Sequence, residues 1–173
     1  MDQGGLVKIL EKHNRWIAGL MGGERASLSS ANLSRANLSG ANLSSANLSG
    51  ADLSGATGLL SAIDWLALCE QTADGWIVYK RIGAGNSQYE PPATWVIEPG
   101  AVLTETVNPD RCTLCGSGVN FGTRAWCDDT YTLAALWRCL IRWQDGPGVV
   151  VPYNTDGKAR CERLQLLEIV EES

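Results

Sequence analysis

A run of near-identical five-residue units between Ala26 and Leu60 constrains the fold of this chain more than any other feature. The alanine and the leucine of each unit stand two positions apart, so both point to one face of an extended backbone, while the intervening Asn or Asp points to the other face. A five-residue period fits neither an α-helix nor a continuous strand, so the chain must turn a corner in each unit, at the Ser-Ser or Ser-Gly pair. We therefore expect a β-solenoid with an apolar inside and a polar outside.

The leucines of these units recur at every fifth position, and we expect them to form the solenoid core: Leu28, Leu33, Leu38, Leu43, Leu48 and Leu53. The alternative interpretation is a disordered linker, because the segment is rich in Ser, Gly and Asn. A linker has no need of leucine at a fixed spacing, so the pattern favours the solenoid.

The units Ala31-Asn32-Leu33, Ala36-Asn37-Leu38, Ala41-Asn42-Leu43, Ala46-Asn47-Leu48 and Ala51-Asp52-Leu53 closely resemble the pentapeptide-repeat family. The resemblance implies a right-handed quadrilateral β-helix, with four units per coil, leucine on the axis and alanine beside it. Seven units then give fewer than two coils. So short a solenoid needs support from the preceding helix, from the following domain or from a second copy of the chain.

Apolar residues upstream of the repeats recur at helical spacing: Leu6, Ile9, Leu10, His13, Trp16, Ile17 and Leu20. This pattern predicts an amphipathic helix within residues 1–24 that ends at Gly22-Gly23. Because a solenoid exposes unpaired strand edges at its ends, we expect this helix to cap the N-terminal end. His13 is the only histidine and is expected to be a buried structural residue, which argues against ordinary Ser-His or Cys-His catalysis.

The composition changes after Leu60, which divides the chain into a capping helix (1–24), a pentapeptide-repeat solenoid (25–60) and an α+β domain with a mostly antiparallel sheet (61–173). Runs of β-branched, aromatic and leucine residues bounded by Gly, Pro or Asn predict strands. The expected strands cover residues 76–80, 95–97, 102–107, 140–143, 149–151 and 164–169. Short helices are expected at 61–69 and 123–129, and residues 133–137 are ambiguous between helix end and strand.

The third segment also resembles an uncharacterised domain that follows pentapeptide repeats in bacteriophage and prophage proteins. The likeness covers most of residues 62–172 and is carried by Gly75-Trp76-Ile77-Val78-Tyr79-Lys80, Pro91-Pro92-Ala93-Thr94-Trp95, Asn108-Pro109-Asp110-Arg111, Cys115-Gly116-Ser117-Gly118-Val119-Asn120 and Val151-Pro152-Tyr153-Asn154-Thr155-Asp156-Gly157-Lys158. It implies a phage setting and no particular reaction.

Cys112 and Cys115 form a Cys-x-x-Cys pair, followed at longer intervals by Cys127 and Cys139. A close pair on a turn is a frequent first half of a structural zinc site, so the candidate metal ligands are Cys112, Cys115 and Cys127. A second close pair is missing, and no histidine lies nearby. Ordinary thiols are therefore the alternative interpretation, and no other cofactor is expected.

A glycine-rich stretch follows the cysteine pair, and the candidate ligand-binding or partner-binding residues around it are Arg111, Gly116, Gly118, Asn120 and Arg124. The stretch matches neither a Walker loop nor the dinucleotide fingerprint. A structural turn is the alternative interpretation. The adjacent acids Asp128 and Asp129 point apart on a helix, so capping or a solvated surface is expected of them.

Charge and hydropathy argue against nucleic-acid binding and against contact with a membrane. The net charge is −5 and Lys and Arg form no cluster, so nucleic-acid binding is not expected. The sequence shows neither a signal peptide nor an apolar run long enough for a membrane span, so we expect no membrane contact and a cytoplasmic location, in a host cell or with a virion. In that compartment the cysteines are expected to be reduced.

We therefore expect a non-enzymatic interaction or assembly protein of a phage or prophage, either a particle component or a modulator of a host system. Its partner would be a protein, including a second copy bound through the solenoid. An enzyme or metal-binding domain that uses residues 112–129 is the alternative. Some pentapeptide-repeat proteins inhibit DNA gyrase by imitating acidic duplex DNA, but the repeats here are too short and carry no net charge.

Overall fold

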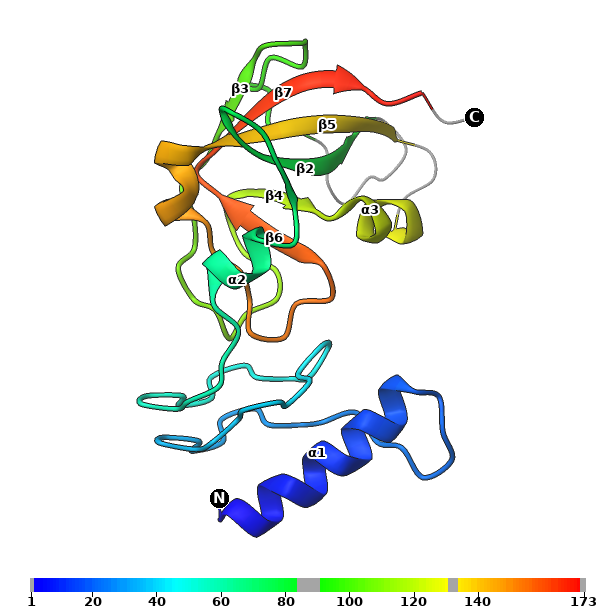
Figure 1. The fold of residues 1–173 in the computed structure, drawn as a ribbon, viewed down its shortest axis with the longest axis vertical. Coiled ribbons are helices and arrows are strands. Elements are labelled where there is room, and N and C mark those ends of the chain that lie inside the picture. Colours follow the sequence, from blue (N-terminus) through cyan, green and yellow to red (C-terminus); the bar gives the residue numbers. More distant parts are fainter. Residues whose placement is uncertain (1, 84–90, 131–133, 172–173) are drawn as a thin grey trace. The chain divides into compact units, whose positions relative to one another are not determined.

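The computed structural model in Figure 1 describes residues 2–83, 91–130 and 134–171. The chain forms two compact units. The repeat unit comprises residues 1–60 together with two later segments, 110–115 and 152–156. The sheet unit comprises residues 61–109, 116–151 and 157–173.

The repeat unit begins with helix α1 (Gln3–Ile17), as the apolar spacing predicts. Asp2 caps its start, because the carboxylate oxygen Oδ1 accepts a hydrogen bond from the Gly5 amide at 2.7 Å. The expected end at Gly22-Gly23 is wrong. The helix ends at Ile17, and Gly19 follows in the left-handed conformation at φ +66°, an ordinary helix terminus. The buried stripe is also shorter than expected, since Leu20 is 59% exposed.

The repeats run as two stacked rounds of chain, a first coil (residues 26–45) and a second coil (46–60). Parallel bridges join Ser27 to Asn47, Asn32 to Asp52 and Asn37 to Thr57, so the chain returns beside itself after twenty residues. The leucines at 28, 33, 38, 43 and 48 are buried in one cluster, and Leu53 packs against that cluster half-buried. The repeat segment thus buries its leucines while isolated bridges, not long strands, join its coils.

The first six of the seven five-residue units turn at their last position, where the backbone adopts a positive φ. Glycine stands there at 40, 50 and 55, and Ser30, Arg35 and Ser45 adopt the same conformation at 55°, 60° and 62°. The Asn or Asp of each unit stabilises the corner, because its side-chain oxygen accepts a hydrogen bond from the serine amide two residues later. The Asn42 oxygen and the Ser44 amide, 3.0 Å apart, are one example.

The sheet unit contains a seven-stranded sheet in which every paired strand is antiparallel, which confirms the expected mostly antiparallel sheet. The order is β3-β7-β5-β2-β4-β6, with β1 beside β2. In chain order the elements are α2 (Ala62–Leu66), β1 (Glu70–Gln71), β2 (Gly75–Ile82), β3 (Val102–Thr104), β4 (Val119–Gly122), α3 (Arg124–Thr130), β5 (Ala135–Arg142), a 3₁₀ helix (Trp143–Gly148), β6 (Lys158–Cys161) and β7 (Arg163–Ile169).

Several expected elements of the sheet unit need correction. Residues 95–97 form a loop, not a strand, and the expected strand at 102–107 ends at Thr104. The segment 149–151 contributes a single bridge, from Val150 to Arg160. The ambiguous segment 133–137 is the start of strand β5 from Ala135 onward, and Leu133 lies outside the described residues.

The loop at 95–97 has a physical reason. The Trp95 amide donates to the Pro92 carbonyl at 2.9 Å, which closes a turn and removes this donor from any strand ladder. The Trp95 indole instead donates a hydrogen bond to the Thr104 carbonyl at 3.1 Å, and the Lys80 amine lies 5.3 Å from the centre of the indole ring. Side-chain contacts therefore hold this segment where the local composition predicts a strand.

Candidate interaction site on the repeat unit

Helix α1 covers the outer edge of the first coil (Figure 1). Leu6 is 1% exposed and packs on the leucine cluster. His13 is fully buried, and its Nδ1 accepts a hydrogen bond from the Ala26 amide at 3.2 Å.

The Gln3 side-chain amide donates to the Asn37 carbonyl at 3.3 Å. Thr57 of the second coil bonds to the Ala36 carbonyl and to the Leu38 amide, the two neighbours of Asn37. In a parallel ladder the backbone groups of the residue between them point the other way, so the Asn37 carbonyl points away from the second coil. Polar side chains thus replace the missing neighbour coil at this edge.

Two loops from the later part of the sequence cover the outer edge of the second coil. The Asn154 side-chain amide donates to the Ala46 carbonyl at 2.8 Å, and the Cys112 thiol lies 3.7 Å from the Ala51 carbonyl. The Arg111 guanidinium donates to the Leu60 carbonyl and lies 4.0 Å from the centre of the Tyr153 ring. Cys112 and Tyr153 also pack against the leucine cluster. These loops therefore supply hydrogen-bond donors to second-coil carbonyls, which in a longer solenoid would pair with the backbone amides of a third coil.

Three units of the first coil pair with the second coil, and in each of them the leucine amide donates to a carbonyl of the second coil. The donors Leu28, Leu33 and Leu38 lie 2.8, 2.8 and 2.9 Å from the carbonyl oxygens of Asn47, Asp52 and Thr57. In the fourth unit of the first coil, no backbone group of the described residues pairs with the Leu43 amide or with the Ala41 carbonyl. The ladder between the coils is therefore open at residues 41–43.

The corner after the open segment is closed again. The Ser45 amide donates to the Asn154 carbonyl at 2.9 Å. The corresponding corner residues Ser30 and Arg35 donate to Ser49 and Ser54 of the second coil, each at 2.8 Å. The loop 152–156 thus takes the place of a second-coil corner, and it leaves the preceding side uncovered.

A hollow of about 320 Å³ lies at this uncovered side, which we call the open side. Its lining residues are Gly40, Ala41, Asn42, Leu43, Ser44, Leu60, Tyr153 and Thr155. Among them are apolar side chains and hydroxyl groups, but no carboxylate, amine, thiol or imidazole. Such a lining suits recognition of an extended backbone, and its hydroxyl groups have no carboxylate, amine or imidazole beside them in the lining to act as a base.

The candidate metal ligands are divided between the two units. Cys112 and Cys115 belong to the repeat unit, whereas Cys127 belongs to the sheet unit. Burial raises the pKa of the Cys112 thiol and raises that of Cys127 to about 11, which disfavours the thiolate that zinc binding requires. In the described ranges 2–83, 91–130 and 134–171, no three His, Cys, Asp or Glu residues gather as a metal site.

The candidate ligand-binding residues are divided in the same way, since Arg111 lies in the repeat unit and the other four in the sheet unit. The Asn120 side-chain amide donates to the carbonyls of Gly116 and Gly118, at 3.1 and 3.0 Å, and so closes a turn. A Cβ on Gly118 would lie 2.9 Å from the Val107 side chain. The structure therefore gives these glycines a packing role in a turn.

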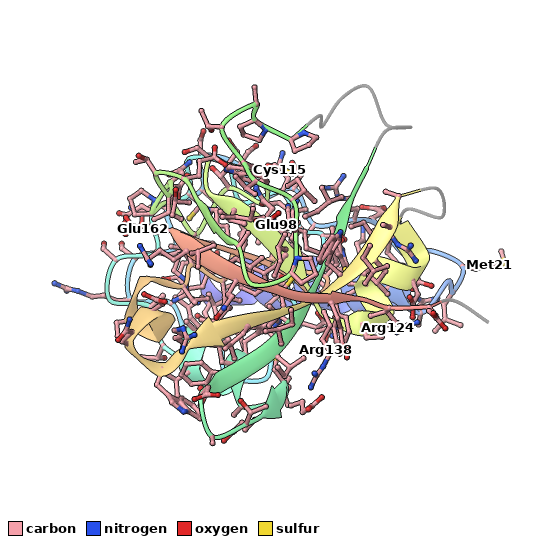
Figure 2. The ribbon with its side chains drawn as sticks, turned by 90° about the horizontal axis from the view of Figure 1, so that it is seen from above. Met21, Glu98, Cys115, Arg124, Arg138 and Glu162 are labelled. Atoms are coloured by element: carbon pink, nitrogen blue, oxygen red, sulfur yellow. The ribbon has the colours of Figure 1, made fainter. Side chains whose placement is uncertain are left out.

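Arg124 lies on helix α3 (Figure 2), where its Nε donates to both carboxylate oxygens of Asp128, at 3.0 and 2.9 Å. Its guanidinium also lies 5.8 Å from the centre of the Tyr79 ring. Such an exposed ion pair one helical turn apart contributes about 0.5 kcal/mol to stability. Arg124 and Asp128 thus engage each other on the surface of α3.

The open side was not among the residues expected to bind a partner. One sequence signal marks it. The seventh unit, Ala56-Thr57-Gly58, carries glycine where the others carry leucine, so the repeat pattern weakens just before the place where an eighth unit would cover residues 41–43. The contributions of Tyr153 and Thr155 have no comparable signal, because they come from a loop more than a hundred residues away.

Acidification is expected to destabilise the repeat unit through His13. Burial lowers the pKa of this imidazole below its usual 6.5, the nearby Ser44 backbone raises it by less, and the charge of Arg25 lowers it further. The unfolded chain therefore binds more protons than the folded chain just below pH 6.5, so the free energy of unfolding falls as the pH drops. A protonated Nδ1 would also lose its bond from the Ala26 amide. Thermal unfolding at pH 7.5 and at pH 5.5 measures this effect.

The His13→Asn variant is the matched control, because its side-chain oxygen can accept from the Ala26 amide and takes up no proton in this range. Its melting temperature should change less between the two pH values than that of the parent chain. Equal pH dependence in both proteins would contradict the role given to His13.

Comparison with known proteins assigns the repeats. Residues 24–57 match the pentapeptide-repeat family, with eight copies of the unit, which confirms the resemblance of this segment. No curated protein and no solved structure matches the chain. The expected likeness of residues 62–172 to a phage domain has no counterpart in these comparisons. None of the helices in the described part of the chain is long and apolar enough to cross a membrane.

Proposed function

We propose that this chain acts by binding another protein through its repeat unit and does not catalyse a reaction. The open side carries the proposal. It is an unpaired stretch of ladder beside a hollow, in a unit whose outer edges are covered by α1 and by the loops 110–115 and 152–156. Uncovered backbone pairing groups next to apolar side chains are a common means of peptide recognition.

The proposal takes the repeat segment as a right-handed quadrilateral β-helix of fewer than two coils. Its support is the parallel pairing of residues twenty positions apart, which equals four five-residue units, and the burial of the leucines. In this geometry the open side is the fourth side of the second coil. The quadrilateral geometry thus explains why one side of the ladder, and not the others, lacks a partner.

The proposal also places the chain among the accessory proteins of a phage or prophage, in the host cytoplasm or on the virion. This setting rests on the likeness that the sequence of residues 62–172 suggests, and the comparisons add no support to it. Structural zinc and a catalytic role of residues 112–129 gain no support from the positions of the cysteines, which lie in different units.

A photo-reactive amino acid at position 42 tests the proposal in cells. Asn42 is exposed and lines the hollow, whereas Asn37 occupies the same place in its unit on a paired side. We expect one defined protein to be cross-linked from position 42 and not from position 37, and to be identified by mass spectrometry. No cross-link from position 42, or the same products from both positions, would overturn the proposal.

A further inference from the structure

The pairing on the three closed sides defines what fits the open side. We infer that the open side binds an extended segment of a partner protein that carries a small residue and, two positions later, a leucine. The segment would lie parallel to residues 41–43 as one more strand of the ladder. This inference rests on the proposed function, because it names the partner chemistry of the same site.

The backbone pattern is the same on each closed side. The middle residue of the second-coil segment donates its amide to an alanine carbonyl and accepts from a leucine amide of the first coil. For Asn47 these bonds reach Ala26 and Leu28 at 2.9 and 2.8 Å. For Asp52 they reach Ala31 and Leu33, at 2.9 and 2.8 Å. A bound segment would therefore use one residue to pair with the Ala41 carbonyl and with the Leu43 amide.

The side-chain preference follows from the alternation of an extended segment. The residue that forms both backbone bonds points outward, and its two neighbours point inward. On the first closed side these inward neighbours are Ala46 and Leu48, which are both 0% exposed. The hollow beside Leu43 is lined by Leu60 and Tyr153, so a leucine would bury apolar surface there. The adjacent inward position, above Ala41, takes a small residue.

The lining also excludes charged residues at the inward positions. None of the residues around the hollow carries a charge, and burial of an unpaired charge is costly. The outward position of the segment has no such restriction, since Asn, Asp and Thr all occupy it in the second coil. The site would thus select a pattern of small residue, any residue and leucine.

The occupant is a different protein, not a second copy, because of where this chain's own repeat segments lie. The segments around residues 47, 52 and 57 already pair with those around 27, 32 and 37. A second copy would have to break one of these bridges to offer a segment of its own second coil. The pairing continues on both sides of the open side. Before it the Leu38 amide bonds to the Thr57 carbonyl, and after it the Ser45 amide bonds to the Asn154 carbonyl.

Amide hydrogen exchange followed by NMR on the full chain tests the inference. In the free protein, the Leu43 amide should exchange faster than the amides of Leu28, Leu33 and Leu38, which serve as internal controls. The probe is a capped synthetic peptide, Ser-Ala-Asn-Leu-Ser-Gly, which copies residues 45–50. Its addition at about 1 mM should shift the resonances of residues 40–44 and slow the exchange of the Leu43 amide.

Two control peptides separate this mode of binding from others. Methylation of the asparagine backbone nitrogen removes the donor for the Ala41 carbonyl, and replacement of the leucine by lysine places a charge in the hollow. Each change should weaken binding about tenfold or more. Equal affinity of the parent peptide and the methylated peptide, or shifts confined to residues away from the open side, would overturn the inference.

The remaining outcomes distinguish this inference from the proposed function. Fast exchange of the Leu43 amide without peptide binding would overturn the partner chemistry, while a cross-link from position 42 would still support a protein partner. Slow exchange of the Leu43 amide in a monomer would overturn both. Slow exchange in a dimer detected by light scattering would assign the open side to a second copy and overturn the inference.

Discussion

Replacement of Leu48 by lysine is expected to abolish folding of the repeat unit. Leu48 is 0% exposed and belongs to the leucine cluster between α1 and the second coil. The change removes a buried leucine and places an ammonium group among apolar side chains, for a combined cost of roughly 5 kcal/mol or more. Two coils bury few other apolar residues, so we expect the loss of soluble folded protein, measured by circular dichroism and size-exclusion chromatography.

Ser49→Lys is the matched control, because it introduces the same charge one position later. Ser49 is exposed, and its carbonyl pairs with Ser30 through the backbone, which the substitution retains. The free energy of unfolding of this variant should lie within about 0.5 kcal/mol of that of the parent chain. If Leu48→Lys melted like Ser49→Lys, the inward direction of the repeat leucines would be wrong.

Replacement of Gly58 by alanine is expected to be the second most damaging change. Gly58 has φ +76°, and a Cβ there would lie 2.2 Å from the Ser39 amide nitrogen and 2.3 Å from the Ser39 Cα. The neighbouring atoms belong to the backbone, so relief requires the chain itself to shift. Together with the cost of a non-glycine residue at positive φ, we expect a loss of about 3 kcal/mol in the free energy of unfolding. Chemical denaturation measures this loss.

Gly40→Ala separates the two contributions. Gly40 has nearly the same backbone conformation, φ +74°, but a Cβ there would meet no atom within 4 Å. Its substitution should cost about 1 kcal/mol, from backbone strain alone. Equal losses for the two variants would contradict the close approach of Gly58 to Ser39. The comparison also tests why leucine, which the repeat pattern favours at position 58, is absent there.

The repeats could be predicted because their signals are local. A five-residue period fixes which side chains face inward and where the chain turns, and the structure shows the buried leucines, the positive φ at the corners and the Asn-to-Ser hydrogen bonds. Helix α1 was likewise predictable from the spacing of its apolar residues. Its buried side was overestimated, because hydrophobic spacing indicates a face and does not indicate how much of that face a neighbour covers.

The candidate site could not be predicted in the same way. Cys112 and Arg111 suggest a metal or ligand site when the sequence is read locally, but in the structure they bond to the carbonyls of Ala51 and Leu60. Asn154 donates to Ala46 across more than a hundred residues. An unpaired carbonyl can accept from many kinds of donor. The sequence therefore does not indicate which distant loop will supply that donor.

The sequence by itself determined the inward leucines, the corners, the capping helix and the antiparallel character of the following sheet, since each depends on the direction of neighbouring side chains along a short stretch of backbone. Only the tertiary structure decided that the loops 110–115 and 152–156 join the repeat unit and that residues 41–43 lack a partner strand. Those features depend on contacts between segments far apart in the chain, and such contacts are governed by packing and by the need to pair buried backbone groups.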